Sequence, residues 1–288
     1  RVFVLLWDST DRERKSLSLR RMYRTIAPWV TENPLMLHVR WSDWKTVKNA
    51  IDQCAAVGFE MVILSFGSGF NAERTDKPYL KQMENYARHA RSKDIEIGGY
   101  SLLASRHISA ADDVVMPVGK RPTFGASPCL CSTWGLSYFK KLRNFFKQTG
   151  FTLLEHDGSY PGDPCASSLH PGHRGYTDSR WAQWRVITDF YKECRARGIY
   201  LNVPDFYYLS GSNKCGMGYR ETNWSLPREQ QVIHTRQNIY DGTWVKTPSM
   251  GWMFVPLTQY HGGGAAATIE PLSEHLDHYE RMLYSNLA

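Results

Sequence analysis

The feature that most constrains the fold is a repeated unit in which a helical stretch ends at a glycine and a short apolar run follows directly. It occurs at Gly58, Gly150 and Gly198, where the runs read GFEMVILSFG, GFTLLEHDG and GIYLNVPD. Glycine is common just past a helix C-terminus because it adopts left-handed backbone angles without steric cost. Apolar runs with no wet face are typical of strands in a parallel sheet covered by helices. The repeat therefore predicts an α/β protein.

The same alternation extends over most of the chain. Helices are expected at 43–57, 78–92, 136–149, 180–197, 228–240 and 273–286, and strands at 35–41, 96–103, 199–203, 216–222, 252–257 and 265–269, besides the runs after Gly58 and Gly150. About seven or eight strand-helix units favour a (β/α)8 TIM-type barrel over an open doubly wound sheet. Residues 35–288 are predicted to form this catalytic barrel, and residues 1–34 are predicted to lead into it.

Charge and composition narrow the class of ligand. The net charge is +7, but Lys and Arg are scattered except in the run 12–24, so nucleic-acid binding is not expected. No apolar run is long enough to span a membrane. The chain has 10 Trp, 16 Tyr and 12 Phe, and aromatic faces can stack on the apolar faces of sugar rings. Arg1 at the start and a helical pattern at the end favour a barrel trimmed from a larger multidomain chain.

Polar side chains follow the predicted strands at the point where each strand ends. In a parallel barrel these ends face one pocket, on the side where barrel enzymes build their sites. Two long insertions, 104–135 and 158–177, lie on the same side. The polar residues expected to meet there are His38, Trp41, Tyr100, Glu155, Asp157, Asn202, Asp205, Arg220 and Glu221.

Two carboxylates from different strands suit cleavage of a glycosidic bond, in which one attacks the anomeric carbon and the other protonates the leaving oxygen. Asp157 is the expected nucleophile, and Glu155 shares its strand face because side chains alternate along a strand. An ionised Glu155 would raise the pKa of Asp157, so Glu155 is expected to pair with a cation or bind a sugar hydroxyl. Glu221 is the expected acid/base, with Asp205 and Asp241 as alternatives.

Three segments carry a resemblance to a known group of enzymes. The EHDG at the end of the fourth strand, the stretch GYRETNWSLPREQQVIHTRQNIYDGT and the TPSMGW after it resemble motifs of the α-galactosidase-type clan of retaining glycosidases. The resemblance implies a nucleophile at Asp157, an acid/base at Glu221 and a turn at 248–251. Two departures, Glu155 where the clan usually has Lys and Glu221 where it has Asp, concern the substrate more than the fold.

Together the residues and the resemblance predict a retaining exo-acting α-glycosidase. The expected substrates are oligosaccharides or polysaccharides that carry an α-galactoside or α-N-acetylgalactosaminide. The two-carboxylate mechanism needs no metal and no cofactor. The subsite would be lined by His38, Trp41, Tyr100, Glu155, Asn202, Asp205 and Arg220. A secreted or periplasmic location is expected for such an enzyme, although the apolar run at 2–7 is too short for a signal peptide.

Two other functions remain open from the sequence. A metal-dependent hydrolase could use His156, Asp157, His170 and His173, although strand alternation turns His156 away from Asp157 and the other two histidines lie in a Pro/Gly loop. A barrel that binds sugar without cleaving it is the second alternative.

The six cysteines support neither alternative directly. They show no zinc-ribbon spacing, since one residue separates Cys129 from Cys131 and the usual ligand pair has two between its cysteines. The sequence allows both free buried thiols and disulfides. Cys165 and Cys215 lie near the predicted pocket, but neither has an assigned histidine beside it, so a cysteine nucleophile is not favoured.

Overall fold

The computed structural model describes residues 9–28, 34–123, 125–158 and 162–203, and short pieces at 212–213, 233, 252–254, 259–260, 268–269, 276–277 and 280. The chain divides into two compact units. One comprises residues 39–210, and the other comprises residues 1–38 with 211–288. The sequence instead predicted an entry segment at 1–34 and a barrel at 35–288, and that division stays a prediction. None of the described helices is both long and apolar enough to cross a membrane.

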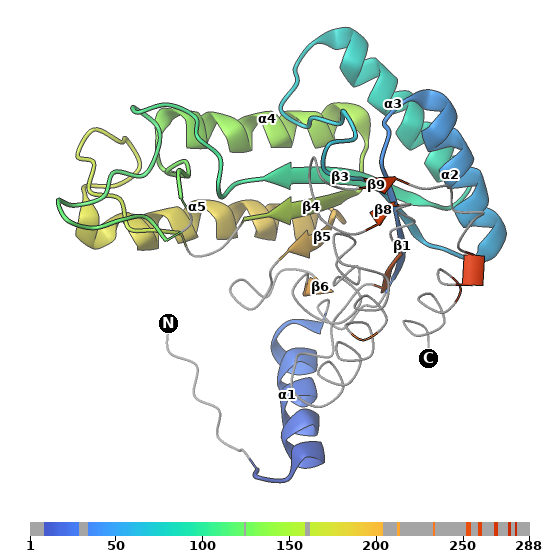
Figure 1. Cartoon of the computed structure of the whole chain (residues 1–288), viewed down its shortest axis with the longest axis horizontal. Helices are drawn as coiled ribbons and strands as arrows, with labels where there is room; N and C mark the ends of the chain where they lie inside the picture. The colour runs from blue at the N-terminus through green and yellow to red at the C-terminus, as the bar shows by residue number, and fades with distance from the viewer. Residues whose placement is uncertain are drawn as a thin grey trace. The chain divides into compact units, whose positions relative to one another are not determined.

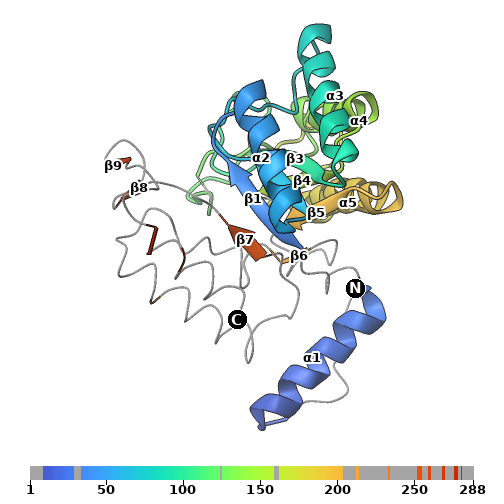
Figure 2. The same ribbon diagram turned by 90° about the vertical axis from the view of Figure 1, so that its right-hand side faces the viewer.

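The unit 39–210 is built from alternating helices and parallel strands (Figures 1 and 2). Each of the three strand pairs in the order β5-β4-β3-β2 is parallel, which is the pairing predicted from the apolar runs. The helices are α2 (Trp44–Val57), α3 (Lys77–Ser92), α4 (Thr133–Thr149) and α5 (Tyr176–Ala196), and the strands are β2 (Met61–Leu64), β3 (Glu96–Leu102), β4 (Leu153–Asp157) and β5 (Tyr200–Val203). The α/β architecture is therefore confirmed.

The helix ends follow the expected glycines, whereas the starts of α4 and α5 differ from prediction by three and four residues. Gly58 and Gly150 have left-handed φ angles of 83° and 71° at the C-caps of α2 and α4. Helix α4 begins at Thr133 rather than 136, because the Ser132 side chain accepts a hydrogen bond from the N–H of Gly135. Helix α5 begins at Tyr176 rather than 180. Asp178 lies inside its first turn and accepts hydrogen bonds from the N–H groups of the two residues before the helix.

The two faces of the sheet have different chemistry. On the face toward the helices, Ser101 contacts the hydroxyl of Tyr138 on α4 at 2.6 Å, and His156 contacts the same hydroxyl at 2.9 Å. The other ring nitrogen of His156 lies 2.7 Å from the hydroxyl of Tyr191 on α5. The opposite face carries Glu155, which is buried. The prediction that His156 and Glu155 point to opposite faces of the strand is confirmed.

The second unit contains α1 (Arg12–Ile26), most of β1 (Leu35–Val39) and the short strands β6 (Ser212–Asn213), β7 (Trp252–Phe254), β8 (Gln259–Tyr260) and β9 (Thr268–Ile269). Strands β1 and β7 pair in parallel, as a strand-helix repeat requires, whereas β8 and β9 pair antiparallel. The predicted strand at 216–222 lies outside the described residues, and the helices at 228–240 and 273–286 lie almost entirely outside them.

Candidate functional site

The carboxylate of Asp157 is held at the C-terminal end of β4. Its Oδ2 accepts a hydrogen bond from the Tyr100 hydroxyl at 2.6 Å, and its Oδ1 accepts one from the N–H of Gly158 at 2.8 Å. The Asp157 carbonyl accepts a further bond from the N–H of Leu103 at 2.8 Å, so the backbone is fixed as well. The side chain is half-buried. Asp157 thus offers a positioned carboxylate with remaining access from solvent.

A row of polar side chains crosses the sheet at Glu155, two residues before Asp157 in β4. Tyr100 on β3, Glu155 on β4 and Asn202 on β5 are register partners, so their side chains project from the same face. Glu155 and Asn202 are each 1% exposed. Two strand positions further back the same face becomes apolar, at Leu153. The sheet therefore presents a buried polar floor close to the Asp157 carboxylate.

Two exposed aromatic side chains follow the ends of β1 and β2. Trp41 is 59% exposed, and the guanidinium of Arg40 lies 5.9 Å from its ring centroid. Phe66 is 66% exposed and packs edge-on against Tyr100 at 5.3 Å between centroids. Exposed aromatic rings can stack on the apolar face of a sugar. Sequence reasoning missed Phe66, although its place directly after the run GFEMVILS was the available signal.

The remaining predicted site residues fall into two groups. His38 is buried in β1, in the unit formed by residues 1–38 and 211–288. The residues Asp205, Arg220, Glu221 and Asp241 lie outside the described residues. The structure thus brings together Tyr100, Glu155, Asp157 and Asn202, and the role of each stays a prediction.

The set of four residues behind the metal-hydrolase alternative is divided in space. Both ring nitrogens of His156 face tyrosine hydroxyls on the helix side of the sheet, whereas Asp157 accepts a hydrogen bond from Tyr100. His170 and His173 instead contact the sulfur atoms of Cys165 and Cys129. This geometry does not support a metal site shared by His156 and Asp157.

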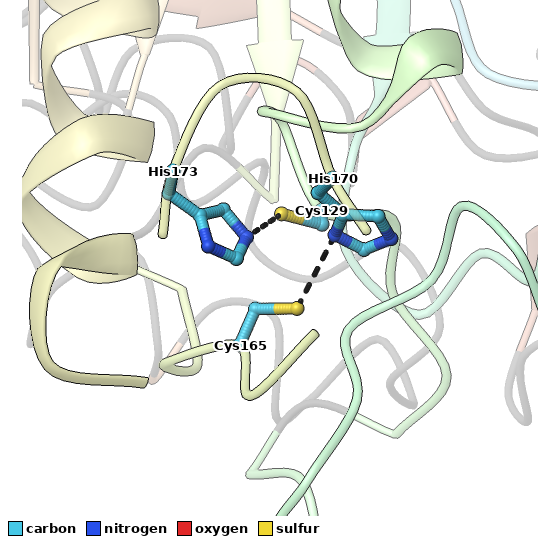
Figure 3. Close-up of side chains that lie close together, drawn as sticks. All are labelled: Cys129, Cys165, His170 and His173. Carbon is cyan, nitrogen blue, oxygen red and sulfur yellow. Dashed lines mark hydrogen bonds between the residues drawn. The ribbon is translucent and has the colours of Figure 1, made fainter. Parts of the chain in front are cut away.

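The five cysteines within the described residues are all free and buried. The pKa of the Cys165 thiol is raised to about 12. The larger cause is its hydrogen bond with the Cys129 thiol, and the smaller cause is burial. A free thiol with such a pKa is protonated at neutral pH and is a poor nucleophile. Cys215 lies outside the described residues. Cys165 lies in a cluster with Cys129, His170 and His173 (Figure 3).

Comparison with known proteins rests on structure. No model of a protein family and no curated protein matches the sequence. The chain is similar to the GH36 α-galactosidase AgaA of Geobacillus stearothermophilus in complex with stachyose, with a TM-score of 0.57, 10% identity and coverage of 95% of this chain. The α-galactosidase AgaB of the same organism gives a TM-score of 0.56 at 12% identity, also over 95%. The fold resembles that of α-galactosidases.

This likeness confirms, at the level of the fold, the resemblance expected from the motifs in strands four to six. The chain spans 45% of the AgaA chain and 44% of the AgaB chain. With identities of 10% and 12%, the comparison establishes the architecture, and the chemistry has to be argued from the residues of this chain.

A substitution at Gly158 tests how closely the backbone at the end of β4 packs against Ala104. Its φ is +69°, and a Cβ at this position would lie 2.7 Å from the Cβ of Ala104 and closer still to the Ala104 nitrogen. We expect Gly158→Ala to lower the free energy of unfolding by about 3 kcal/mol or more, since backbone strain and a clash add together. Gly198→Ala is the matched control, because its φ is +70° with nothing within 4 Å, and should cost only about 1–2 kcal/mol. Urea unfolding measures both, and equal losses would contradict the close approach.

Proposed function

We propose that the chain forms the (β/α)8 catalytic barrel of a retaining, exo-acting α-glycosidase, with Asp157 as nucleophile and Glu221 as acid/base. The observation that carries the proposal is the Asp157 carboxylate, which lies at the C-terminal end of a parallel strand and is held by the Tyr100 hydroxyl at 2.6 Å. It stands above a buried polar floor, in a fold similar to that of α-galactosidases. Active sites of barrel enzymes lie at this end of the strands.

In the proposed reaction, an oxygen of Asp157 attacks the anomeric carbon from the face opposite the leaving group. Glu221 gives its proton to the glycosidic oxygen as the bond to the aglycone breaks, which leaves a β-linked glycosyl ester on Asp157. Glu221 then takes a proton from water, and the water oxygen displaces Asp157 to give the α-configured sugar. The mechanism requires the two carboxyl groups to lie about 5–5.5 Å apart.

The hydrogen bonds at Asp157 suit a nucleophile. The bonds from Tyr100 and from the Gly158 N–H, one to each carboxylate oxygen, fix the orientation of the carboxylate. Glu155 and Asn202, on the floor below, would accept or donate hydrogen bonds to sugar hydroxyls, and Trp41 and Phe66 would flank the apolar face of the ring. The proposed sugars are α-galactosides and α-N-acetylgalactosaminides.

A panel of nitrophenyl glycosides in both anomeric series tests enzyme status and sugar class together. We expect turnover of the α-galactoside or the α-N-acetylgalactosaminide and none of the β anomers. Proton NMR of the first-formed product should show the α anomer. A β anomer formed first would exclude the retaining mechanism. If no glycoside is cleaved while calorimetry detects sugar binding, the chain is instead a binding barrel, which the exposed Trp41 and Phe66 would also serve.

Tyr100→Phe tests the positioning of Asp157. We expect kcat to fall by about 10- to 100-fold with little change in KM, because the lost hydrogen bond orients a group that acts in the transition state. Tyr79→Phe is the matched control, because the Tyr79 hydroxyl accepts from the N–H of Asn71, whereas the Tyr100 hydroxyl donates to Asp157. An unchanged kcat would contradict the positioning role.

A further inference from the structure

A buried cluster of two thiols and two imidazoles joins the loops that follow β3 and β4 (Figure 3). Cys129 comes from the β3–α4 loop, and Cys165, His170 and His173 come from the β4–α5 loop. Their ligand atoms all lie within 4.8 Å of one another. Sγ of Cys129 is 3.3 Å from Nε2 of His173, and Sγ of Cys165 is 3.4 Å from Nδ1 of His170.

The two sulfur–nitrogen separations are close to the edge lengths of a tetrahedron around a metal ion. Zn–S bonds of about 2.3 Å and Zn–N bonds of about 2.0–2.1 Å put sulfur and nitrogen ligands about 3.5 Å apart in tetrahedral geometry. Two thiolates and two imidazoles form the Cys2His2 set that zinc takes in structural sites. The four side chains are between 0% and 8% exposed, so a cation would be closed off from solvent.

The surroundings orient the ligands as a metal site requires. Nε2 of His170 lies 2.9 Å from the carbonyl oxygen of Ala111. A carbonyl can only accept, so Nε2 carries the hydrogen and the lone pair of Nδ1 points toward Cys165. Metal-bound histidines commonly donate their other N–H to a backbone carbonyl in this way. The N–H of Val115 donates to Sγ of Cys165 at 3.4 Å, which would stabilise the thiolate that forms when a bound metal ion displaces the thiol proton to solvent.

The turn that carries both histidines packs closely against the β3–α4 loop. His170, Pro171, Gly172 and His173 form the sequence HPGH, and the Gly172 N–H donates to the Cys131 carbonyl at 3.0 Å. A Cβ on Gly172 would lie 2.7 Å from the Cβ of Cys131. The absence of a side chain therefore lets the turn approach Cys129 and Cys131 closely enough for both histidines to face the sulfurs.

We propose that Cys129, Cys165, His170 and His173 bind a structural zinc ion that fastens the β3–α4 loop to the β4–α5 loop. Four protein ligands leave no position open for water or substrate, so the ion would stabilise structure and take no part in bond cleavage. Cys131 is also buried beside the cluster but lies outside the set of four. It provides a control that is close in space, equally buried and of the same residue type.

The test measures metal directly and needs no activity. Full-length protein expressed with zinc and purified under reducing conditions should contain about one equivalent of zinc by mass spectrometry. Protein stripped of metal and titrated with Co²⁺ should develop the visible bands of tetrahedral cobalt and a thiolate-to-cobalt band in the near ultraviolet. Cys129→Ser and His173→Gln should each lose at least nine-tenths of the zinc, whereas Cys131→Ala should keep it.

Each alternative outcome has a defined meaning. Wild-type protein without zinc and without a Co²⁺ spectrum would overturn the proposal, even if the variants fail to fold. A disulfide between Cys129 and Cys165 in the unreduced protein, with no metal regained after reduction, would also overturn it. Equal metal loss in Cys131→Ala and Cys129→Ser would exclude the assigned ligand set. Metal content is measured without any assay of glycosidase activity, so the two proposals can fail separately.

Discussion

Replacing Asp157 with asparagine should lower kcat on a nitrophenyl α-galactoside by about 10⁴-fold or more, which corresponds to about 5.4 kcal/mol of lost transition-state stabilisation. An amide cannot form the glycosyl ester, whereas its size is nearly that of the carboxylate. Its oxygen can still accept from the Gly158 N–H, and its NH2 group can donate to the Tyr100 hydroxyl in place of the bond that Tyr100 now donates. The fold should therefore persist, with a melting temperature within a few degrees of the wild type. Stopped assays with single-turnover enzyme concentrations measure the residual rate.

Two controls separate the loss of a nucleophile from a general loss of function. Asp189→Asn makes the same substitution on the exposed face of α5, where the carboxylate lies 3.7 Å from Arg185, and should leave kcat unchanged. Asp157→Gly with added azide should regain turnover and give the β-configured glycosyl azide, because the small anion attacks where the carboxylate stood. If Asp157→Asn retains wild-type kcat, the assignment of the nucleophile is wrong.

Strand alternation predicted the local geometry of β4 correctly because β4 is regular. Residues two apart in a strand share a face. Glu155 and Asp157 could therefore be assigned to one face and His156 to the other from the sequence alone. The apolar runs also indicated the parallel pairing, since strands of a parallel sheet with both faces covered typically have continuous apolar sequences. The register partners of Glu155 across the sheet, Tyr100 and Asn202, followed from the position of each near a strand end.

The loops gave no comparable signal. Helix α5 begins four residues before the predicted start because Asp178 caps it from inside the first turn, a pattern that reads equally well as an N-cap. The partners Cys129 and Cys165 stand far apart in sequence and come together only because β3 and β4 are adjacent. Periodicity describes regular elements, and irregular loops are positioned by specific hydrogen bonds such as Thr123 to Asp163.

The loops proposed to bind zinc start beside the candidate nucleophile. The N–H of Leu103 donates to the Asp157 carbonyl, and Gly158 lies against Ala104, so both loops leave the sheet at the same point. Farther out, the Ala166 N–H donates to the Val115 carbonyl at 2.7 Å, and Asp163 accepts two hydrogen bonds from Thr123. A metal crosslink would hold these contacts together, and its loss would reach Asp157 through the shared backbone.

Removing the metal with a chelator should therefore destabilise the protein by about 3–5 kcal/mol and lower its melting temperature by about 10 °C, because a structural ion contributes folding free energy directly. Hydrogen exchange should accelerate at residues 103–123 and 162–175, while α3 stays protected. Activity should fall several-fold and return when zinc is restored. Cys54→Ala removes a buried thiol of α2 that does not belong to the set of four ligands, and this variant should respond to chelator as the wild type does. Unchanged melting and exchange after chelation would show that the loops are held by hydrogen bonds and packing alone.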